Sequence, residues 1–560
     1  MDAPRSERPD ADDRRSSYAS LAILVGFVLL YALLPSRNTN YADDSLDWAE
    51  QLTRTAGLVN SHHLALNIWR VVWHGLTDGL GLAIAPQRLL ALWSAICGAL
   101  GLLALWHLLR RTHPGPLALA AVLACGFSSG YWSYAIVGDV YVPAIAFLLI
   151  GTERFLAALH APDTRRATQA ALAAIAALFV SVLHHQAHAV YVAVLAPATL
   201  LLGGIRWSRR LAVAGAVPLL VGVLSLATYA GVYSTRPKAP DSSFGGFLAG
   251  YAGHFDARAD QKVVGVRAAV NALGGEARAL LSYNVLFRSK AATRAIQARF
   301  PYRNVYPYPY LVRNLPLPLA SGIWFAAVLA GLLAFALVSM GIVRAIGARD
   351  SALLLLVSAL PQAAFFMWWE GISDEFWLWT IPTLMVLAAT GARALGRYAT
   401  AAMASLAALL FVSTLLGSVL LFADPTNDID TVNDAYLKRV QGQDVLVTWD
   451  GIQSTARAHL LMRHTPFQYF NIQAEAAHWD MADSTEMERL ISGTLREGGH
   501  IWLGPYLRDM PASNMRFILD QNPAFRGTYP RLIARLEQLD STRTTWLQPV
   551  ARDPDLFERY

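Results

Sequence analysis

The first group of residues able to do chemistry is a cluster of carboxylates just after the first apolar stretch of the chain. Residues 38–48 read NTNYADDSLDW, so Asp43, Asp44 and Asp47 lie within a few positions of one another. Ionisable groups close to the hydrocarbon of a membrane are costly and indicate function by default. A carboxylate there suits general-base chemistry, because partial burial raises its pKa toward neutral pH.

Further acidic and imidazole groups occur in other turns. His62 and His63 follow in the same loop, and Asp139 begins the segment Asp139-Val140-Tyr141. The remaining members are His184, His185, His188, Glu370, Asp374 and Glu375. Solvation at a membrane–water boundary is the ordinary alternative interpretation for each carboxylate. The i, i+4 spacing of His184 and His188 is typical of metal ligands, but no nearby Cys or carboxylate completes a recognisable pattern.

Apolar stretches must position these groups. Runs of about 18 residues or more can span a bilayer. We expect about eleven such helices, at 18–36, 88–109, 117–134, 140–159, 168–183, 189–204, 211–233, 318–342, 352–369, 376–395 and 400–422. The fold class predicted is therefore a polytopic α-helical membrane protein with a small C-terminal α/β domain.

Composition separates the membrane part from the tail. The 560 residues are 55% hydrophobic and 15% charged, where soluble proteins carry about 25% charged residues. Residues 424–560 hold 33 charged residues, about 24% of that segment, against about 12.5% of the rest. This distribution excludes a soluble enzyme, a disordered chain and a fibrous protein, and we expect no nucleic-acid partner.

The short loops predict the orientation of the chain. Arginines at 110, 111, 154, 165, 166, 206, 209, 210, 344, 349, 393 and 397 all fall on one side. Positively charged short loops are cytoplasmic. We therefore expect a cytoplasmic N-terminal tail at 1–17, a membrane domain at 18–422 and a periplasmic domain at 423–560, in a bacterial inner membrane.

Two large loops, 37–87 and 234–317, then face outward. The spacing of Leu64, Ile68, Val71, Val72 and Leu76 predicts an amphipathic helix along the membrane surface in the first loop. The second loop has a net charge of +8. Its arginines can attract anionic headgroups of membrane lipids or a phosphate.

The tail reads as alternating strands and helices. The segments 443–449 (QDVLVTW) and 499–503 (GHIWL) are strand-like, and 454–463 and 485–497 are helical in pattern. No glycine-rich phosphate fingerprint occurs in the tail, so nucleotide binding there is not supported.

The plan of a first helix, an acidic outer loop, further helices and an outer C-terminal domain resembles the GT-C glycosyltransferases. Asp44-Ser45-Leu46-Asp47-Trp48 resembles the Gly-Asp-Ser-Gly-Glu-Phe stretch of their protein O-mannosyltransferase-like branch. His62 and His63 match a following His-Pro segment, Gly138-Asp139-Val140-Tyr141 resembles a Glu-Val-Tyr segment, and His185 falls where the branch has Asn-His. The likeness covers about the first 210 residues, and it departs at His63-Leu64-Ala65, where the branch has prolines and Gly-Tyr-Pro.

This resemblance implies a glycosyltransferase with a polyprenyl-phosphate-linked sugar donor and hexosyl or mannosyl transfer. Asp44 is the first choice for the general base and Asp43 the second, with Asp47 orienting the base or the acceptor. We expect Asp139, His62, His63, Tyr141 and His185 to bind substrate. The departing phosphate needs cations, for which the second loop offers Arg288, Lys290, Arg294, Arg299 and Arg303.

The resemblance leaves other matters open. A divalent metal assists some members of the class, and the sequence does not demand one. The acceptor is a protein, a lipid or a polysaccharide. A transporter or flippase of lipid-linked glycans is one alternative, although it predicts ionisable groups at the bilayer midplane and related halves. A non-catalytic glycan-binding assembly protein is another.

Overall fold

The computed structural model is mainly helical and consists of two compact units. The first comprises Met1–Pro35, Arg54–Tyr283 and Ile323–Val419, and the second comprises Ser36–Thr53, Asn284–Gly322 and Leu420–Tyr560. The structure describes residues 9–38, 44–53, 63–235, 243–245, 247–248, 264–299, 307–429, 437, 439–448, 468–472, 484–504, 507–508, 515, 519, 522–523 and 525–547.

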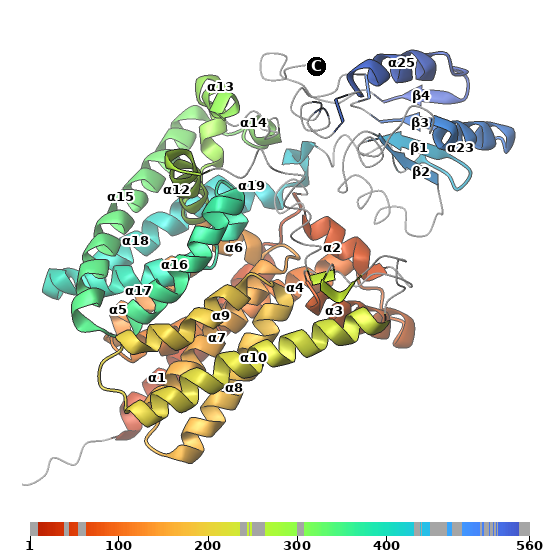
Figure 1. The fold of residues 1–560 in the computed structure, drawn as a ribbon. Helices are drawn as coiled ribbons and strands as arrows, with labels where there is room; N and C mark the ends of the chain where they lie inside the picture. The colour runs from red at the N-terminus through yellow and green to blue at the C-terminus, as the bar shows by residue number, and fades with distance from the viewer. Residues whose placement is uncertain are drawn as a thin grey trace, which may run out of the picture. The chain divides into compact units, whose positions relative to one another are not determined.

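Helices make up most of the first unit (Figure 1). They are α1 (Pro9–Leu33), α3 (Ala65–His74), α4 (Pro86–Arg110), α5 (Gly115–Gly126), α6 (Ser129–Ala135), α7 (Tyr141–His160), α8 (Thr164–His184), α9 (His188–Ala198), α10 (Trp207–Thr235), α12 (Val266–Leu280), α15 (Leu317–Ala348), α16 (Ser351–Glu370), α17 (Thr380–Ala392) and α18 (Ala399–Thr414). The 3₁₀ turn η5 (Asp374–Trp377) lies between α16 and α17.

The predicted fold class of a polytopic helical protein with a small α/β domain is confirmed. Within the described residues, seven helical stretches are long and apolar enough to cross a membrane. They are Pro86–Arg110, Tyr141–His160, Thr164–His184, Trp207–Ser234, Leu317–Ala348, Ser351–Glu370 and Thr380–Ala423. All eleven predicted stretches overlap helices, and the last two share Thr380–Ala423, which bends at Gly396 (φ 56°). The number of spans and their sidedness stay predictions.

Two predicted stretches differ from the helices observed. The stretch 117–134 is broken between α5 and α6, where Ser128 Oγ donates to the carbonyl of Cys125 at 2.7 Å. A serine hydroxyl bonded to a nearby carbonyl offers the backbone an alternative to helix. The stretch 376–395 starts as η5, and its α-helix begins only at Thr380.

The second unit contains the described strands. Its elements are α2 (Asp44–Thr53), η4 (Asn284–Arg288), α13 (Lys290–Arg299), α14 (Pro307–Leu311), α19 (Leu420–Ala423), β1 (Val445–Thr448), β2 (Gln468–Asn471), α23 (Ser484–Arg496), β3 (Ile501–Leu503), α25 (Phe525–Glu537) and β4 (Thr544–Trp546). The strands form one parallel sheet in the order β2-β1-β3-β4. The predicted strands at 443–449 and 499–503 and the helix at 485–497 are confirmed, and 454–463 lies outside the described residues.

Alternation along the strands explains how the sheet packs. Successive side chains of a strand point to opposite faces. Val445, Val447, Ile501 and Leu503 join a buried core with residues of α23 and α25, which cover the sheet (Figure 1). The intervening residues of β1 and β3, Leu446 and Trp502, pack in a separate cluster with Leu437 and Val440.

Candidate functional site

A small pocket in the first unit gathers aromatic and imidazole side chains from segments that are far apart in the sequence. They come from the start of α7, the junction of α8 and α9, the end of α16 and the turn before α17. The lining residues are Tyr141, Ile145, His185, His188, Phe366, Glu375, Phe376 and Trp379. The hollow between them has a volume of about 10 Å³, enough for about one water molecule, so these side chains form a closely packed aromatic and imidazole cluster.

Aromatic contacts fix the walls of the pocket. The rings of Phe366 and Phe376 stack with centroids 4.8 Å apart and planes inclined by 7°. The ring of His185 lies 5.1 Å from that of Tyr141 and 6.1 Å from that of Phe366. The contacts between these rings place flat apolar surfaces along the wall of the pocket.

The geometry around His188 determines which of its ring nitrogens carries the proton. Ser181 Oγ donates to the carbonyl oxygen of Ala144 at 2.8 Å, so its single hydrogen is already used. It must therefore accept from His188 Nδ1, which lies 2.7 Å away. In neutral His188 the other nitrogen, Nε2, is then a hydrogen-bond acceptor.

Two other histidines are oriented by backbone carbonyls. Nδ1 of His63 donates to the carbonyl of His184 at 2.6 Å, and the ring of His63 lies 5.5 Å from that of His185. Nδ1 of His184 donates to Val180 at 2.9 Å, and this ring stacks on those of Trp93 and Phe147. Within the part of the chain that the structure describes, no three His, Cys, Asp or Glu side chains are arranged to hold a metal ion.

The turn before α17 contacts α12 and also lines the pocket. A 3₁₀ helix repeats every three residues, so Asp374 and Trp377 share a face, and Glu375 and Phe376 lie off that face. Asp374, Trp377 and Thr380 make contacts with residues of α12. Glu375, Phe376 and Trp379 line the pocket, and Ser373 Oγ donates to Glu375 at 3.2 Å. The turn therefore links α12 to the pocket wall.

Asp139 stands at the entrance to α7. Its Oδ1 accepts from the backbone N–H of Val140 at 2.5 Å and of Tyr141 at 3.4 Å. A carboxylate at a helix N-terminus satisfies N–H groups that lack intrahelical partners and complements the helix dipole. Asp139 is buried and thereby fixes the first turn of α7, from which Tyr141 reaches the pocket.

The structure brings together four residues that were predicted to bind substrate, namely His63, Asp139, Tyr141 and His185, all in the first unit. Asp44 and Asp47 lie in the first turn of α2, in the second unit, where Gln51 Nε2 donates to Asp47 at 2.6 Å. Arg288 Nε donates to the carbonyl of Leu315 at 2.9 Å. Arg294 is exposed on α13. Asp43, His62 and Arg303 lie outside the described residues.

Sequence reasoning did not identify Ser181, Phe366 or Glu276. Ser181 lies one turn before His184 on α8, so the helical spacing was a usable signal for a polar partner of the histidines. Phe366 is one of many aromatic residues in apolar runs and carries no such signal. Glu276 was counted only within the charge of its loop.

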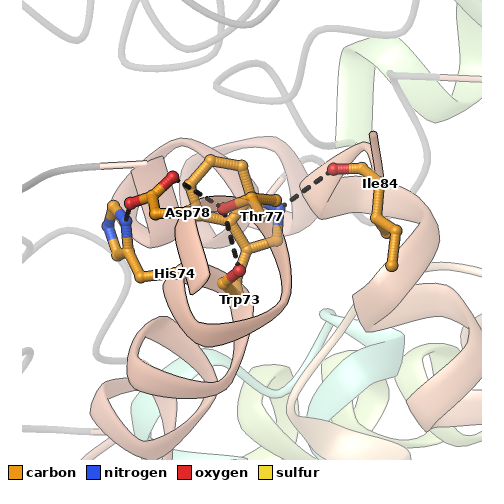
Figure 2. A network of polar contacts seen from close by, with 5 residues as sticks. All are labelled: Trp73, His74, Thr77, Asp78 and Ile84. Carbon is orange, nitrogen blue, oxygen red and sulfur yellow. Dashed lines mark hydrogen bonds and ion pairs between the residues drawn. The ribbon is translucent and has the colours of Figure 1, made fainter. Parts of the chain in front are cut away.

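The first loop also contains a polar network that does not belong to the pocket (Figure 2). Asp78 accepts from His74 Nδ1 at 2.7 Å and from Thr77 at 3.0 Å, and these hydrogen bonds lower the pKa of its carboxyl. Trp73 Nε1 donates to the carbonyl of Ile84 at 3.1 Å. The network closes the turn between α3 and α4. On α3 the apolar side chains of Ile68 and Val71 are exposed, at 58% and 69%.

Comparison with known proteins gives structural likeness only. No family model matches the chain, and no curated protein sequence matches it. ArnT from Cupriavidus metallidurans bound to undecaprenyl phosphate is 14% identical with a TM-score of 0.48, covering 81% of this chain and 85% of that one. The Archaeoglobus fulgidus oligosaccharyltransferase in its apo form is 14% identical with a TM-score of 0.47, covering 82% and 65%. AglB from the same organism, in complex with an inhibitory peptide and a dolichol-phosphate, is 12% identical with a TM-score of 0.41, covering 81% and 64%.

Proposed function

We propose that this chain is a membrane glycosyltransferase that uses a polyprenyl-phosphate-linked sugar as donor and a hydroxyl group as acceptor. The observation that carries the proposal is the pocket at the ends of apolar helices, where stacked aromatic rings meet two histidines and a carboxylate. The hollow of about 10 Å³ must widen to admit a sugar ring. Aromatic faces then suit the apolar C–H surface of the ring, and Nε2 of His188 and the carboxylate of Glu375 can accept from its hydroxyls.

The transfer itself exchanges one bond to the anomeric carbon for another. The acceptor oxygen bonds to that carbon while the carbon–phosphate oxygen bond breaks, and the phosphate leaves with the electron pair. Asp44 takes the acceptor's proton as general base, with Asp43 as the second choice and Asp47 orienting the acceptor. Arg288, Arg294 and Arg303 are the candidates to stabilise the phosphate charge.

The finer parts of the proposal come from the sequence resemblance. The likeness to the protein O-mannosyltransferase-like branch favours hexosyl or mannosyl transfer, with Asp139, His62, His63, Tyr141 and His185 on the substrate. The positive-inside pattern favours a bacterial inner membrane with transfer on the periplasmic face. The acceptor is a protein, a lipid or a polysaccharide.

Transfer assays on variants test this function. Membranes containing the full-length protein are supplied with a radiolabelled polyprenyl-phosphate-linked mannose, and label is measured in the protein, lipid and polysaccharide fractions after the donor has been separated from them. Asp44→Asn removes the base at nearly constant shape, so we expect its transfer rate to fall at least ~100-fold, as losses of general bases do. Asp78→Asn is the matched control, because Asp78 is an exposed carboxylate of the same loop bonded to His74.

Three outcomes are informative. Loss in Asp44→Asn with wild-type rates in Asp78→Asn supports the base assignment. Wild-type rates in both Asp44→Asn and Asp43→Asn contradict it. Movement of the intact labelled lipid between leaflets, with no transfer by the wild-type protein, identifies a flippase and overturns the proposed function.

A further inference from the structure

Helix α12 is held directly against the turn that forms one wall of the pocket. Gly275 makes this approach possible, since a Cβ at that position would collide with the carbonyl of Gly371 and reach Trp377 Nε1 at 2.5 Å. A Cβ at Gly371 would in turn lie 3.1 Å from the backbone nitrogen of Ala272. The two backbones therefore touch with no side chain between them.

An ion pair anchors one end of this contact. Arg278 of α12 pairs with Asp374 at 2.8 Å and donates to the carbonyl of Ile372 at 2.8 Å. Nη2, the nitrogen that pairs with Asp374, also donates to the hydroxyl of Tyr283 at 2.9 Å. Arg278, the cationic residue nearest to Glu276 in the sequence, is thus paired with Asp374.

Glu276 makes the second contact, and its carboxyl has no counter-ion among the described residues. Both of its oxygens lie 2.7 Å from Thr380 Oγ, at the first residue of α17. Within the residues that the structure describes, Thr380 is its hydrogen-bond partner and no ion pair includes it. Thr380 directly follows Trp379, which lines the pocket.

We infer that Glu276 is a positioning residue for the pocket wall, holding α12 on the turn 371–380 while its carboxyl is protonated and weakening that contact when the carboxyl ionises. A half-buried carboxylate without a cation costs free energy, which a neutral carboxylic acid does not. The inference goes beyond the proposed transfer and does not depend on which reaction the pocket serves.

The pKa of Glu276 determines how the docking of α12 on the turn 371–380 depends on pH. Burial raises its pKa from 4.5 to about 7, and the hydrogen bond from Thr380 opposes the rise. The docked state therefore binds the proton more tightly than an undocked one. Docking is strongest below the ordinary pKa of a glutamate, weakens as the pH rises from about 4.5 to about 7, and is constant above that.

Other charged and titratable groups also lie on α12 and on the elements packed against it. The elements packed against it are η5, α16, α6 and α17. α17 carries no charged residue. The charged or titratable groups on the other three, with those of α12 itself and its C-terminal flank, are Asp374, Glu375, Glu370, Tyr131, Tyr134, Arg267, Arg278 and Tyr283. Asp374 is paired with Arg278, and Glu370 and Glu375 belong to other elements, so Glu276 is the carboxyl within the described helix α12 itself.

Hydrogen–deuterium exchange of the full-length protein in lipid nanodiscs tests the inference at pH 5 and pH 8. Rates are corrected for the intrinsic pH dependence of exchange. We expect peptides covering 266–280 and 371–380 to exchange about tenfold faster at pH 8 in the wild type. In Glu276→Gln, which keeps the shape without the charge, the corrected rates should be equal at the two pH values and match wild type at pH 5.

Two further variants sharpen the test. Glu497→Gln, at an exposed glutamate of the second unit, is the matched control and should retain the wild-type pH dependence. Thr380→Val removes the hydroxyl, and both peptides should then exchange faster even at pH 5. A pH-independent wild type, a Glu276→Gln protein with unchanged pH dependence, or a Thr380→Val protein that behaves as wild type would each overturn the inference.

Discussion

The Nδ1 atom of His188 lies 2.7 Å from Oγ of Ser181, and the direction of this hydrogen bond is fixed because Ser181 donates to the carbonyl of Ala144. The histidine therefore offers Nε2 as an acceptor at a pocket that is otherwise aromatic. One serine, outside the pocket lining, thus sets the hydrogen-bonding character of the site.

Replacing Ser181 with alanine should release this constraint. Nδ1 of His188 loses its partner, and the ring can adopt the other tautomer, whose Nε2–H repels a sugar hydroxyl hydrogen. We expect transfer from the polyprenyl-linked donor to fall about tenfold, equivalent to 1.4 kcal/mol. Ser181→Thr keeps the hydroxyl and should recover most of the rate. Equal losses in both variants would contradict this role.

The approach of α12 to the turn 371–380 predicts a steric effect at Gly275. In Gly275→Ala the new methyl group meets the carbonyl of Gly371 and the indole of Trp377. Overpacking of this kind costs about 1–3 kcal/mol, so the midpoint of thermal unfolding should fall. Gly215→Ala on α10, where no atom lies within 4 Å of the new methyl group, should leave the midpoint unchanged or raise it. Equal midpoints for the two variants would exclude the close approach.

The ion pair between Arg278 and Asp374 predicts a larger loss. Asp374→Asn leaves a mostly buried guanidinium without its counter-ion, which costs about 3 kcal/mol in buried pairs. The exposed pair of Asp163 and Arg166, 3.6 Å apart, supplies the control, since Asp163→Asn should cost less than about 0.5 kcal/mol. The free energy of unfolding in denaturant titrations measures both. A cost for Asp374→Asn as small as that of the control would contradict the structural role.

The hydrogen bonds of Asp444 should stabilise the sheet of the second unit. Its carboxylate accepts from the backbone of Gln441 and His500 and from Trp502 Nε1, at 2.8, 2.9 and 2.9 Å. Asp444→Ala leaves buried donors without a partner, at about 1–3 kcal/mol each. Amide exchange in β1 and β3 should accelerate, while that in α7 of the first unit stays unchanged. Uniform acceleration in both units would argue against a local role.

The apolar helices could be predicted from the sequence because a helix that crosses the hydrocarbon of a membrane needs only a sufficiently long run of apolar residues. It predicted β1 and β3 because their strands are buried apolar runs. The strand β2 begins with Gln468 and ends with Asn471, so its composition carries no strong signal. The histidines and Asp139 were found from their polarity in apolar surroundings.

Other features of the site depend on contacts between distant segments. The turn 371–380 was recognised as acidic and rich in tryptophan, but the sequence did not show that Asp374 pairs with Arg278 while Glu375 lines the pocket. Glu276 and Thr380 are 104 positions apart, and no local pattern pairs them. Ser181 and Phe366 likewise gain their roles from tertiary packing.

The most direct test of the account follows the donor itself. The purified full-length protein in nanodiscs is incubated with a synthetic polyprenyl-phosphate-linked sugar and a membrane extract as acceptor, and the free polyprenyl phosphate is measured by mass spectrometry. A glycosyltransferase releases polyprenyl phosphate in amounts equal to the sugar that appears on acceptor glycans, and Asp44→Asn does not. Intact donor after incubation with the wild-type protein would contradict the proposed function.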